Sequence, residues 1–344
     1  MYTIMDYLKY YQNISLDDIH LNILDQLVMA ILVYLPVPDF KGFKTWSEFY
    51  SLAKEKENKD YKGMMVPKSY EVLNYIKDSL RYKKMKIANF TNVKNEKTQF
   101  GACKFLLGKN TIIAFKGTDA SSIGWFENFR LLYEYPTYTQ RLALTYLEEN
   151  IKFNDKNVYV VGHSKGGNLA MSSAMELNAS LFKKVKKVYN FDGPGFLQKE
   201  YQSLKFKELQ QKLVNVIPTG SVVGCLLYNK DYLVTESREL AFNEHYPTTW
   251  GVFGEFFQEG VLSSVSKYLH ESTTKGLDNL ESEKLKEAIE MLILNVDKKY
   301  DEEFEFNLND IKNLLKNREN LDADVVKYLL EMISSMMNAM KENK

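Results

Sequence analysis

The sequence predicts an α/β fold, in which a mixed and mostly parallel sheet is covered by helices on both faces. Strand-like and helix-like segments alternate with short links between residues 86 and 250, the pattern of a parallel sheet with crossover helices. The run VYVV at residues 158–161 is apolar throughout, as expected of a strand buried on both faces. The turn signal GKN at residues 108–110 predicts a hairpin, so antiparallel strands are expected at one end of the sheet.

Residues 1–85 are predicted to be helical. Ser15 or Asp17 is expected to cap a helix whose apolar positions run from residue 19 to residue 28, and a second helix is expected at residues 69–80. The most apolar stretch, residues 27–36, has ten residues and falls short of the ~20 that a membrane-spanning helix needs. A buried helix is therefore predicted there, and no transmembrane segment.

The alternating region supplies the other core elements. Strands are expected at residues 86–90, 100–107, 111–115, 158–161, 185–191 and 214–217. Helices are expected at residues 140–151, 168–178 and 199–213.

The last part of the chain differs in character. Residues 251–344 carry few strand signals, and helical periodicity is strongest at residues 282–294 and 323–340. Two parts are therefore predicted: residues 1–250 as a core with an N-terminal helical segment, and residues 251–344 as a helical extension packed on it.

The bulk composition limits the function classes. The 344 residues include 45 Lys+Arg and 45 Asp+Glu, so the net charge is zero and nothing indicates a nucleic-acid partner. Cys103 and Cys225 lack metal-site or redox-motif spacing and are expected to be buried and reduced. The N-terminus lacks a basic segment followed by an apolar run, so no signal peptide and a cytoplasmic location are predicted.

One motif carries candidate chemistry. Residues 162–166, GHSKG, fit the pattern G-x-S-x-G between an apolar strand and a helical run. In such a strand–turn–helix the serine hydroxyl is exposed, and the glycines let strand and helix approach closely. Ser164 is therefore the candidate nucleophile. The alternative is a glycine-rich turn with a capping serine.

A serine nucleophile needs a base, and the chain has four histidines. The order Ser…acid…His places the base downstream of Ser164. His20 lies far upstream, His163 is expected to point into packing, and His270 lies in a helical pattern and is expected at the surface. His245 lies in a predicted loop after the last strand and is the candidate base. Its alternative role is that of an ordinary loop histidine.

The candidate acid is Asp192. It ends the strand at residues 185–191, and a carboxylate there can reach the imidazole, fix its tautomer and stabilise the imidazolium. The alternative is a turn-forming aspartate before a glycine. Asp231 is the second candidate, because it also keeps the chain order.

Two backbone amides are predicted to form an oxyanion hole. They are the N–H of Thr118, in the loop after the strand at residues 111–115, and the N–H of Lys165. A cation at the start of a helix opposes the macrodipole, so the Lys165 side chain is expected to be solvated or to attract an anionic substrate group. This chemistry needs no metal or organic cofactor.

These motifs resemble a known family. Three features resemble the class 3 lipase-like branch of the α/β-hydrolases: residues 114–118 (AFKGT), Trp125 and the G-x-S-x-G turn at residues 162–166, called the elbow below. The closer similarity is to the bacterial Mbeg1-like, DUF2974 family of predicted lipases. That family's pattern includes residues 191–196 (FDGPGF), the stretch 217–224, and His245 followed by Pro247 and Trp250. The resemblance covers about residues 1–255. It implies an α/β-hydrolase fold and lipid or acyl esters as substrates.

One departure concerns the acid. Class 3 lipases carry the catalytic aspartate after the strand that is here at residues 214–217, where this chain has Ser221 and no carboxylate close by. The FDGPGF segment resembles the acid-bearing turn of pancreatic-type lipases, in which the acid lies one strand earlier. That resemblance supports Asp192.

The leading prediction is a serine hydrolase that cleaves carboxylic (lipid or acyl) esters through an acyl-enzyme, with Ser164, His245 and Asp192 as its triad. The alternatives are a thioesterase or peptidase with the same triad, and an inactive binding or scaffold relative. The expected partner is a small-molecule or lipid ester, and protein partners are not predicted. An apolar lid or acyl pocket is one interpretation of five residues, and core packing is the other: Phe126, Phe129, Leu131, Leu132 and Tyr133.

Overall fold

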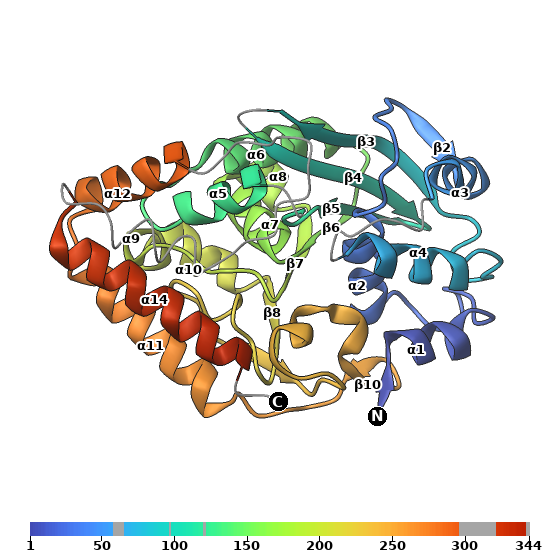
Figure 1. Cartoon of the computed structure of the whole chain (residues 1–344). Coiled ribbons are helices and arrows are strands. Elements are labelled where there is room, and N and C mark those ends of the chain that lie inside the picture. The colour runs from blue at the N-terminus through green and yellow to red at the C-terminus, as the bar shows by residue number, and fades with distance from the viewer. Residues whose placement is uncertain (58–64, 96–97, 120–121, 296–320, 342–344) are drawn as a thin grey trace.

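A computed structural model gives the structure of residues 1–57, 65–95, 98–119, 122–295 and 321–341 (Figure 1). Its centre is an eight-stranded sheet. The strands follow the order β2 (Phe43–Thr45), β3 (Lys86–Lys94), β4 (Gln99–Leu107), β5 (Asn110–Phe115), β6 (Asn157–His163), β7 (Val185–Phe191), β8 (Leu213–Pro218) and β9 (Tyr232–Thr235). Strands β2 to β5 pair antiparallel, and β5 to β9 pair parallel. The predicted mixed sheet with a hairpin at one end is confirmed.

The register brings the ends of the parallel strands level. Phe115 pairs with Gly162, His163 pairs with Phe191, and Phe191 pairs with Val216. In parallel strands the carboxyl ends meet at one edge of the sheet, where α/β folds place their ligands. The residues that follow β5, β6, β7 and β8 therefore start from the same edge.

Helices cover both faces of this sheet. On one face lie α1 (Ile4–Tyr11), α2 (Ile23–Leu32), α3 (Trp46–Glu55) and α4 (Val66–Tyr75), and on the other lie α6 (Tyr138–Asn150), α7 (Lys165–Glu176), α8 (Ala179–Phe182), α9 (Gln198–Tyr201) and α10 (Leu204–Gln210). Alternate residues of β5 serve the two faces: Ile112 and Ala114 pack with the first group, and Ile113 and Phe115 with the second.

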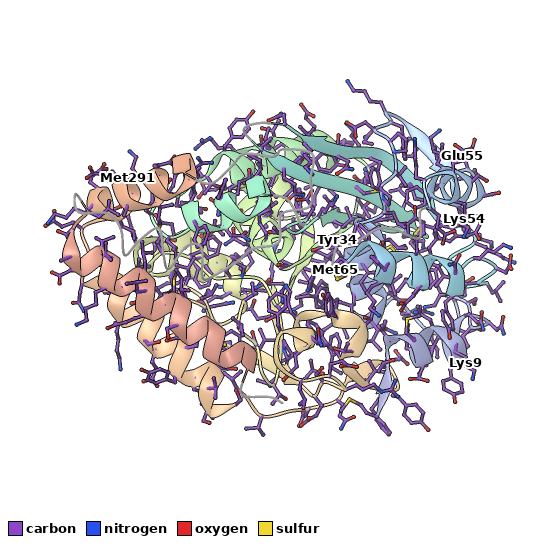
Figure 2. All side chains as sticks on the ribbon, viewed as in Figure 1. Lys9, Tyr34, Lys54, Glu55, Met65 and Met291 are labelled. Atoms are coloured by element: carbon purple, nitrogen blue, oxygen red, sulfur yellow. The ribbon has the colours of Figure 1, made fainter. Side chains whose placement is uncertain are left out.

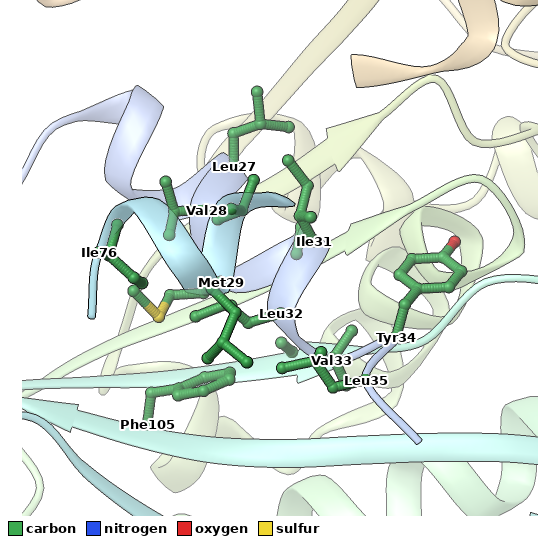
Figure 3. Packing of buried hydrophobic residues seen from close by; sticks show 14 of the residues in the cluster. Leu27, Val28, Met29, Ile31, Leu32, Val33, Tyr34, Leu35, Ile76 and Phe105 are labelled. Atoms are coloured by element: carbon green, nitrogen blue, oxygen red, sulfur yellow. The ribbon is translucent and has the colours of Figure 1, made fainter. Parts of the chain in front are cut away.

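Helix α2 is the predicted buried helix, and its side chains pack against Ile76 and Phe105 (Figure 3). Its predicted start is wrong. The helix begins at Ile23, because the Asn22 side chain accepts hydrogen bonds from the Leu24 and Asp25 amides and the Asp25 side chain accepts one from the Asn22 amide. This reciprocal cap takes the place expected for Ser15 or Asp17, and the Ser15 hydroxyl instead closes a local turn.

Other elements differ from prediction in their bounds. The helix expected at residues 69–80 is α4, which begins three residues earlier at Val66 with a proline in its first turn. The helix expected at residues 199–213 is two short helices, α9 and α10, because the Ser203 hydroxyl caps α10.

Several short strands were not predicted. They are β2, β9, and a separate sheet of β1 (Tyr2–Thr3), β10 (Gly251–Phe253) and β11 (Phe256–Phe257). Strand β10 pairs with β1, so the segment after residue 250 first joins the N-terminus and does not start as a helix. Two 3₁₀ turns precede it, η1 (Ala241–His245) and η2 (Pro247–Thr249).

The helices predicted at residues 282–294 and 323–340 are α12 (Ser282–Asn295) and α14 (Ala323–Lys341), and the helical pattern around His270 belongs to α11 (Ser264–Asp278). They pack beside α5 (Ser122–Arg130), on the left in Figure 1. Their shared cluster includes Phe126, Leu131 and Leu132, with Phe129 and Tyr133 packed against it. These five residues therefore take part in core packing, the second of the two interpretations. The division of the chain at residue 250 stays a prediction.

Two further expectations concern burial. Cys103 and Cys225 are buried and have free thiols, as predicted. In the described part of the chain, no helix combines the length and the apolar character that crossing a lipid bilayer requires.

A buried ion pair joins the N-terminal helices. Arg81 Nε and Nη2 lie 2.7 and 2.6 Å from the two carboxylate oxygens of Asp25, and neither side chain is exposed. The hydroxyl groups of Tyr7 and Tyr82 also donate to this carboxylate. The cluster therefore links α1, α2 and the segment after α4 through one charge pair.

Asp25→Asn leaves the Arg81 guanidinium buried without its counter-charge, so we expect the free energy of unfolding to fall by about 3–5 kcal/mol in urea titrations. The matched control is Lys68→Gln, which breaks the exposed Lys68–Glu71 pair and should cost less than ~1 kcal/mol. Equal losses for the two variants would show that burial does not set the strength of the Asp25–Arg81 pair.

Candidate active site

The G-x-S-x-G segment forms the predicted strand–turn–helix. Strand β6 ends at His163, helix α7 begins at Lys165, and Ser164 lies between them with φ 58° and ψ −135°. A positive φ is strained for a residue with a side chain and costs ~1–3 kcal/mol. A Cβ atom on Gly162 would clash with the carbonyl oxygen of Gly166, so the close approach of strand and helix requires glycine.

Asp192 follows β7 directly and also has a positive φ, 51°. Its carboxylate is fully buried, and Oδ2 lies 2.6 Å from Nδ1 of His245 in η1. Because Nδ1 donates its proton to this carboxylate, the free lone pair of a neutral His245 ring is on Nε2. The structure thus brings together two of the three predicted triad residues, although they are 53 positions apart.

The other oxygen of Asp192 is also satisfied. Oδ1 accepts hydrogen bonds from the Ser221 hydroxyl and from the Gly224 amide, the latter at 3.0 Å. Ser221 follows β8, and its hydroxyl binds the carboxylate of Asp192, which follows the neighbouring strand β7. No carboxylate follows β8 near Ser221 in the sequence, and the one that Ser221 contacts comes from the end of β7.

A second carboxylate also lies nearby. The buried Glu244 side chain accepts a hydrogen bond from the Gly220 amide at 2.7 Å. Burial raises the pKa of Glu244, and the charge of Asp192 raises it further. Sequence patterns gave no sign of this contact because 24 positions separate its partners.

Asp231 lies elsewhere. It is exposed and precedes β9, whose Tyr232 pairs with Asn215 in the parallel strand β8. The carboxyl group is therefore at the amino-terminal edge of the sheet, whereas Asp192 is at the carboxyl-terminal edge. The geometry does not bring Asp231 and His245 together.

His163 points into the interior, as predicted, and links two parts of the site. Its Nε2 lies 2.8 Å from the carbonyl oxygen of His245, and its Nδ1 lies 3.1 Å from the hydroxyl of Tyr34. Tyr34 is buried in the middle of the molecule (Figure 2), with its hydroxyl directed away from the aliphatic cluster (Figure 3). The residue next to Ser164 therefore holds the backbone of His245.

The environment of His163 keeps its ring neutral. Burial is the main cause that lowers the pKa of His163 well below its ordinary range, and the charge of a protonated His245 lowers it further. The hydrogen bond to the His245 carbonyl opposes these effects. A neutral ring carries its proton on Nε2, where it donates to the His245 carbonyl, and its Nδ1 accepts a hydrogen bond from the Tyr34 hydroxyl.

Ser164 is nearly buried, with 8% of its surface exposed. Among the residues that the structure describes, none forms a hydrogen bond with its Oγ. Catalytic hydrogen bonds are often long without substrate and tighten in the complex. His163, the residue before Ser164, is hydrogen-bonded to the His245 carbonyl, so the backbones of these two segments are connected.

The predicted oxyanion loop lies against Ser164, the candidate nucleophile. A Cβ atom on Gly117 would be 3.1 Å from Cβ of Ser164 and would clash with the Tyr34 hydroxyl, so this close approach also requires glycine. Thr118 follows, half-buried. The Lys165 amide is the first of α7, where helix geometry leaves N–H groups without intrahelical partners.

The predicted environment of the Lys165 side chain is wrong. The ammonium is neither solvated nor directed at a substrate: it is 2% exposed and lies 2.5 Å from Oε2 of Glu127. It also donates to the backbone and side-chain oxygens of Gln99, both at 2.9 Å. The unfavourable cation at the helix start is thus neutralised by a carboxylate from α5, which no local pattern could reveal.

His270 is half-buried and not simply at the surface as predicted. Its Nδ1 lies 2.9 Å from the carbonyl oxygen of Cys225, in the loop that holds Asp192. The described side chains include no group of three or more His, Cys, Asp or Glu residues arranged to hold a metal ion.

Comparison with known families agrees with this geometry. Residues 76–293, more than half of the chain, match the model of the Mbeg1-like family. The protein belongs to the Mbeg1-like family. Together with the eight-stranded mixed sheet and its flanking helices, this confirms the predicted α/β-hydrolase fold.

Part of this Mbeg1-like protein is similar to a solved structure. The crystal structure of M37 lipase is similar over 58% of this chain and 68% of its own, with 15% identity and a TM-score of 0.39. No curated protein matches the sequence. The side chain of Trp125, part of the resemblance, lies outside the described residues.

The neutral His163 of this Mbeg1-like protein predicts a pH dependence of stability. In the unfolded chain a histidine takes up a proton below pH ~6.5, whereas buried His163 does not, so stability falls as the pH drops below that value. We expect His163→Gln to remove a slope of up to ~1.4 kcal/mol per pH unit between pH 6.5 and 5.

The measurement is urea denaturation of both proteins across this range. Between pH 7.5 and 8.5 the free energy of unfolding should change with pH equally in wild type and His163→Gln, because a histidine at this position is neutral in the folded and the unfolded chain there. A difference in slope that persists at high pH, or none at low pH, would show that another group is responsible.

Proposed function

We propose that this Mbeg1-like protein is a serine hydrolase that cleaves carboxylic esters through an acyl-enzyme on Ser164. The observation that carries the proposal is the buried hydrogen bond between Asp192 and His245 at the sheet edge where the strained Ser164 also lies. A carboxylate that holds one imidazole nitrogen leaves the other free to accept a proton. Lipid or acyl esters are the proposed substrates, from the resemblance to lipases.

The proposed reaction begins with attack of Ser164 Oγ on the ester carbonyl carbon, while His245 Nε2 accepts the hydroxyl proton. The carbonyl oxygen becomes an anion and is stabilised by the N–H groups of Thr118 and Lys165. His245 then passes its proton to the departing alkoxide, which leaves as the alcohol. Water repeats the sequence on the acyl-enzyme and releases the acid.

The fixed surroundings of Asp192 support this division of roles. Its two oxygens are occupied by His245, Ser221 and Gly224, so the carboxylate is held in one orientation and orients the ring in turn. The positive charge that forms on His245 during the reaction is then paired inside the protein. The proton passes from Ser164 through His245 to the leaving group, and in the second half from water through His245 back to Ser164, while Asp192 stays ionised.

The proposal predicts how the protein reacts with a fluorophosphonate probe and with p-nitrophenyl butyrate. Ser164→Ala should remove labelling and hydrolysis, because the attacking oxygen is gone. His245→Ala should slow labelling and hydrolysis by at least about 10³-fold, because the base is gone. Asp192→Asn should slow them by about 10²–10⁴-fold, because the His245 ring loses the carboxylate that fixes its tautomer and pairs its charge. Rates of labelling and hydrolysis are measured for each variant.

The matched control is Asp231→Asn, the same substitution at the opposite edge of the sheet, which should keep wild-type rates. Wild-type protein that is not labelled would favour an inactive binding or scaffold relative. Labelling with faster turnover of thioester or amide substrates would favour a thioesterase or a peptidase. Full activity of Asp192→Asn would remove this residue from the triad.

A further inference from the structure

We infer that Gln99 is a positioning residue that holds both halves of the oxyanion hole in one geometry. The inference rests on the proposed function, because it concerns the two amides assigned to the oxyanion, those of Thr118 and Lys165. Gln99 is the first residue of β4 and is 1% exposed. A glutamine buried to this degree needs partners for its amide group.

The side chain of Gln99 forms hydrogen bonds with the backbone on both sides of Thr118. Its Nε2 donates to the carbonyl oxygen of Gly117 at 3.2 Å, and its Oε1 accepts from the amide of Asp119 at 3.4 Å. The same Oε1 accepts from Lys165 Nζ at 2.9 Å. One amide group therefore contacts the oxyanion loop and the residue after the nucleophile.

The contact with Gly117 fixes the direction of the Thr118 amide. The carbonyl of Gly117 and the N–H of Thr118 belong to one planar trans peptide, in which they point in opposite directions. A hydrogen bond that orients the carbonyl toward Gln99 therefore turns the N–H to the other side. The neighbouring Gly117 backbone lies against Ser164, so this orientation is set beside the nucleophile.

The second half of the hole is held through the Lys165 side chain. The three N–H groups of its ammonium meet three acceptors, namely Oε2 of Glu127 and the two oxygens of Gln99. Glu127 is fixed in turn, because its Oε1 accepts from the Thr98 hydroxyl at 2.7 Å. All these groups are buried, so the network links β4, α5 and the start of α7 without solvent.

The test replaces Gln99 with an apolar side chain of similar size. In Gln99→Met the Gly117 carbonyl loses its donor, while Lys165 keeps Glu127 and the Gln99 backbone oxygen. We expect kcat for p-nitrophenyl butyrate to fall about 10- to 100-fold, with KM changed less than about twofold, because the oxyanion forms only in the transition state. Fluorophosphonate labelling should slow by a similar factor.

Gln140→Met is the matched control. Gln140 is also a buried glutamine with both amide atoms bonded, to the Thr137 amide at 2.8 Å and to Asn168 at 2.7 Å, but it does not contact the oxyanion loop. Its loss should lower the thermal midpoint to a similar extent as Gln99→Met and change kcat less than about threefold. The comparison separates general destabilisation from positioning.

A second variant covers the case in which Gln99→Met does not fold. Gln99→Glu keeps the shape and the acceptor for Lys165 but has no N–H for Gly117, so the same loss of kcat is expected. Wild-type kcat in either folded Gln99 variant, or an equal loss of kcat in Gln140→Met, would overturn the inference and leave the proposed function intact. If labelling of the wild-type protein does not depend on Ser164, the proposed function and the inference about Gln99 are both contradicted.

Discussion

Asp192 is fully buried, and a negative charge can stay inside a protein only if its oxygens are hydrogen-bonded or paired. Its partners come from two segments that are distant in sequence, the loop with Ser221 and Gly224 and the turn that ends at His245. The folding of both segments is therefore tied to one carboxylate. The same requirement places the imidazole at the carboxyl edge of the sheet.

The C-terminal helices take part in this arrangement. Val222 and Leu227, which flank Gly224, are buried in the cluster of α11, α12 and α14, and His270 of α11 binds the Cys225 carbonyl. Helix α14 contacts η1, which carries His245, and α12 contacts α5, which carries Glu127. Arg130 of α5 pairs with Glu290 of α12 as well. The extension thus packs against the segments that hold Asp192, His245 and Glu127, which are the proposed acid, the proposed base and the partner of Lys165.

The elbow could be predicted from sequence because its requirements are local: a strand, two glycines and a helix around one serine. Asp192 and His245 could be proposed from chain order and strand ends. The partners of Lys165 could not, because Glu127 and Gln99 lie 38 and 66 positions away and show no pattern of their own. Strands of two or three residues, such as β1 and β11, carry no periodicity and were missed for that reason.

The left-handed backbone at Ser164 and Asp192 has a thermodynamic consequence. Two such residues together hold about 2–6 kcal/mol of conformational strain, a sizeable part of the ~5–15 kcal/mol that separates a typical folded domain from its unfolded state. Relaxation of these two turns therefore lowers the conformational free energy once the surrounding contacts loosen. Under rising denaturant the geometry of these two turns should therefore be lost before the sheet melts.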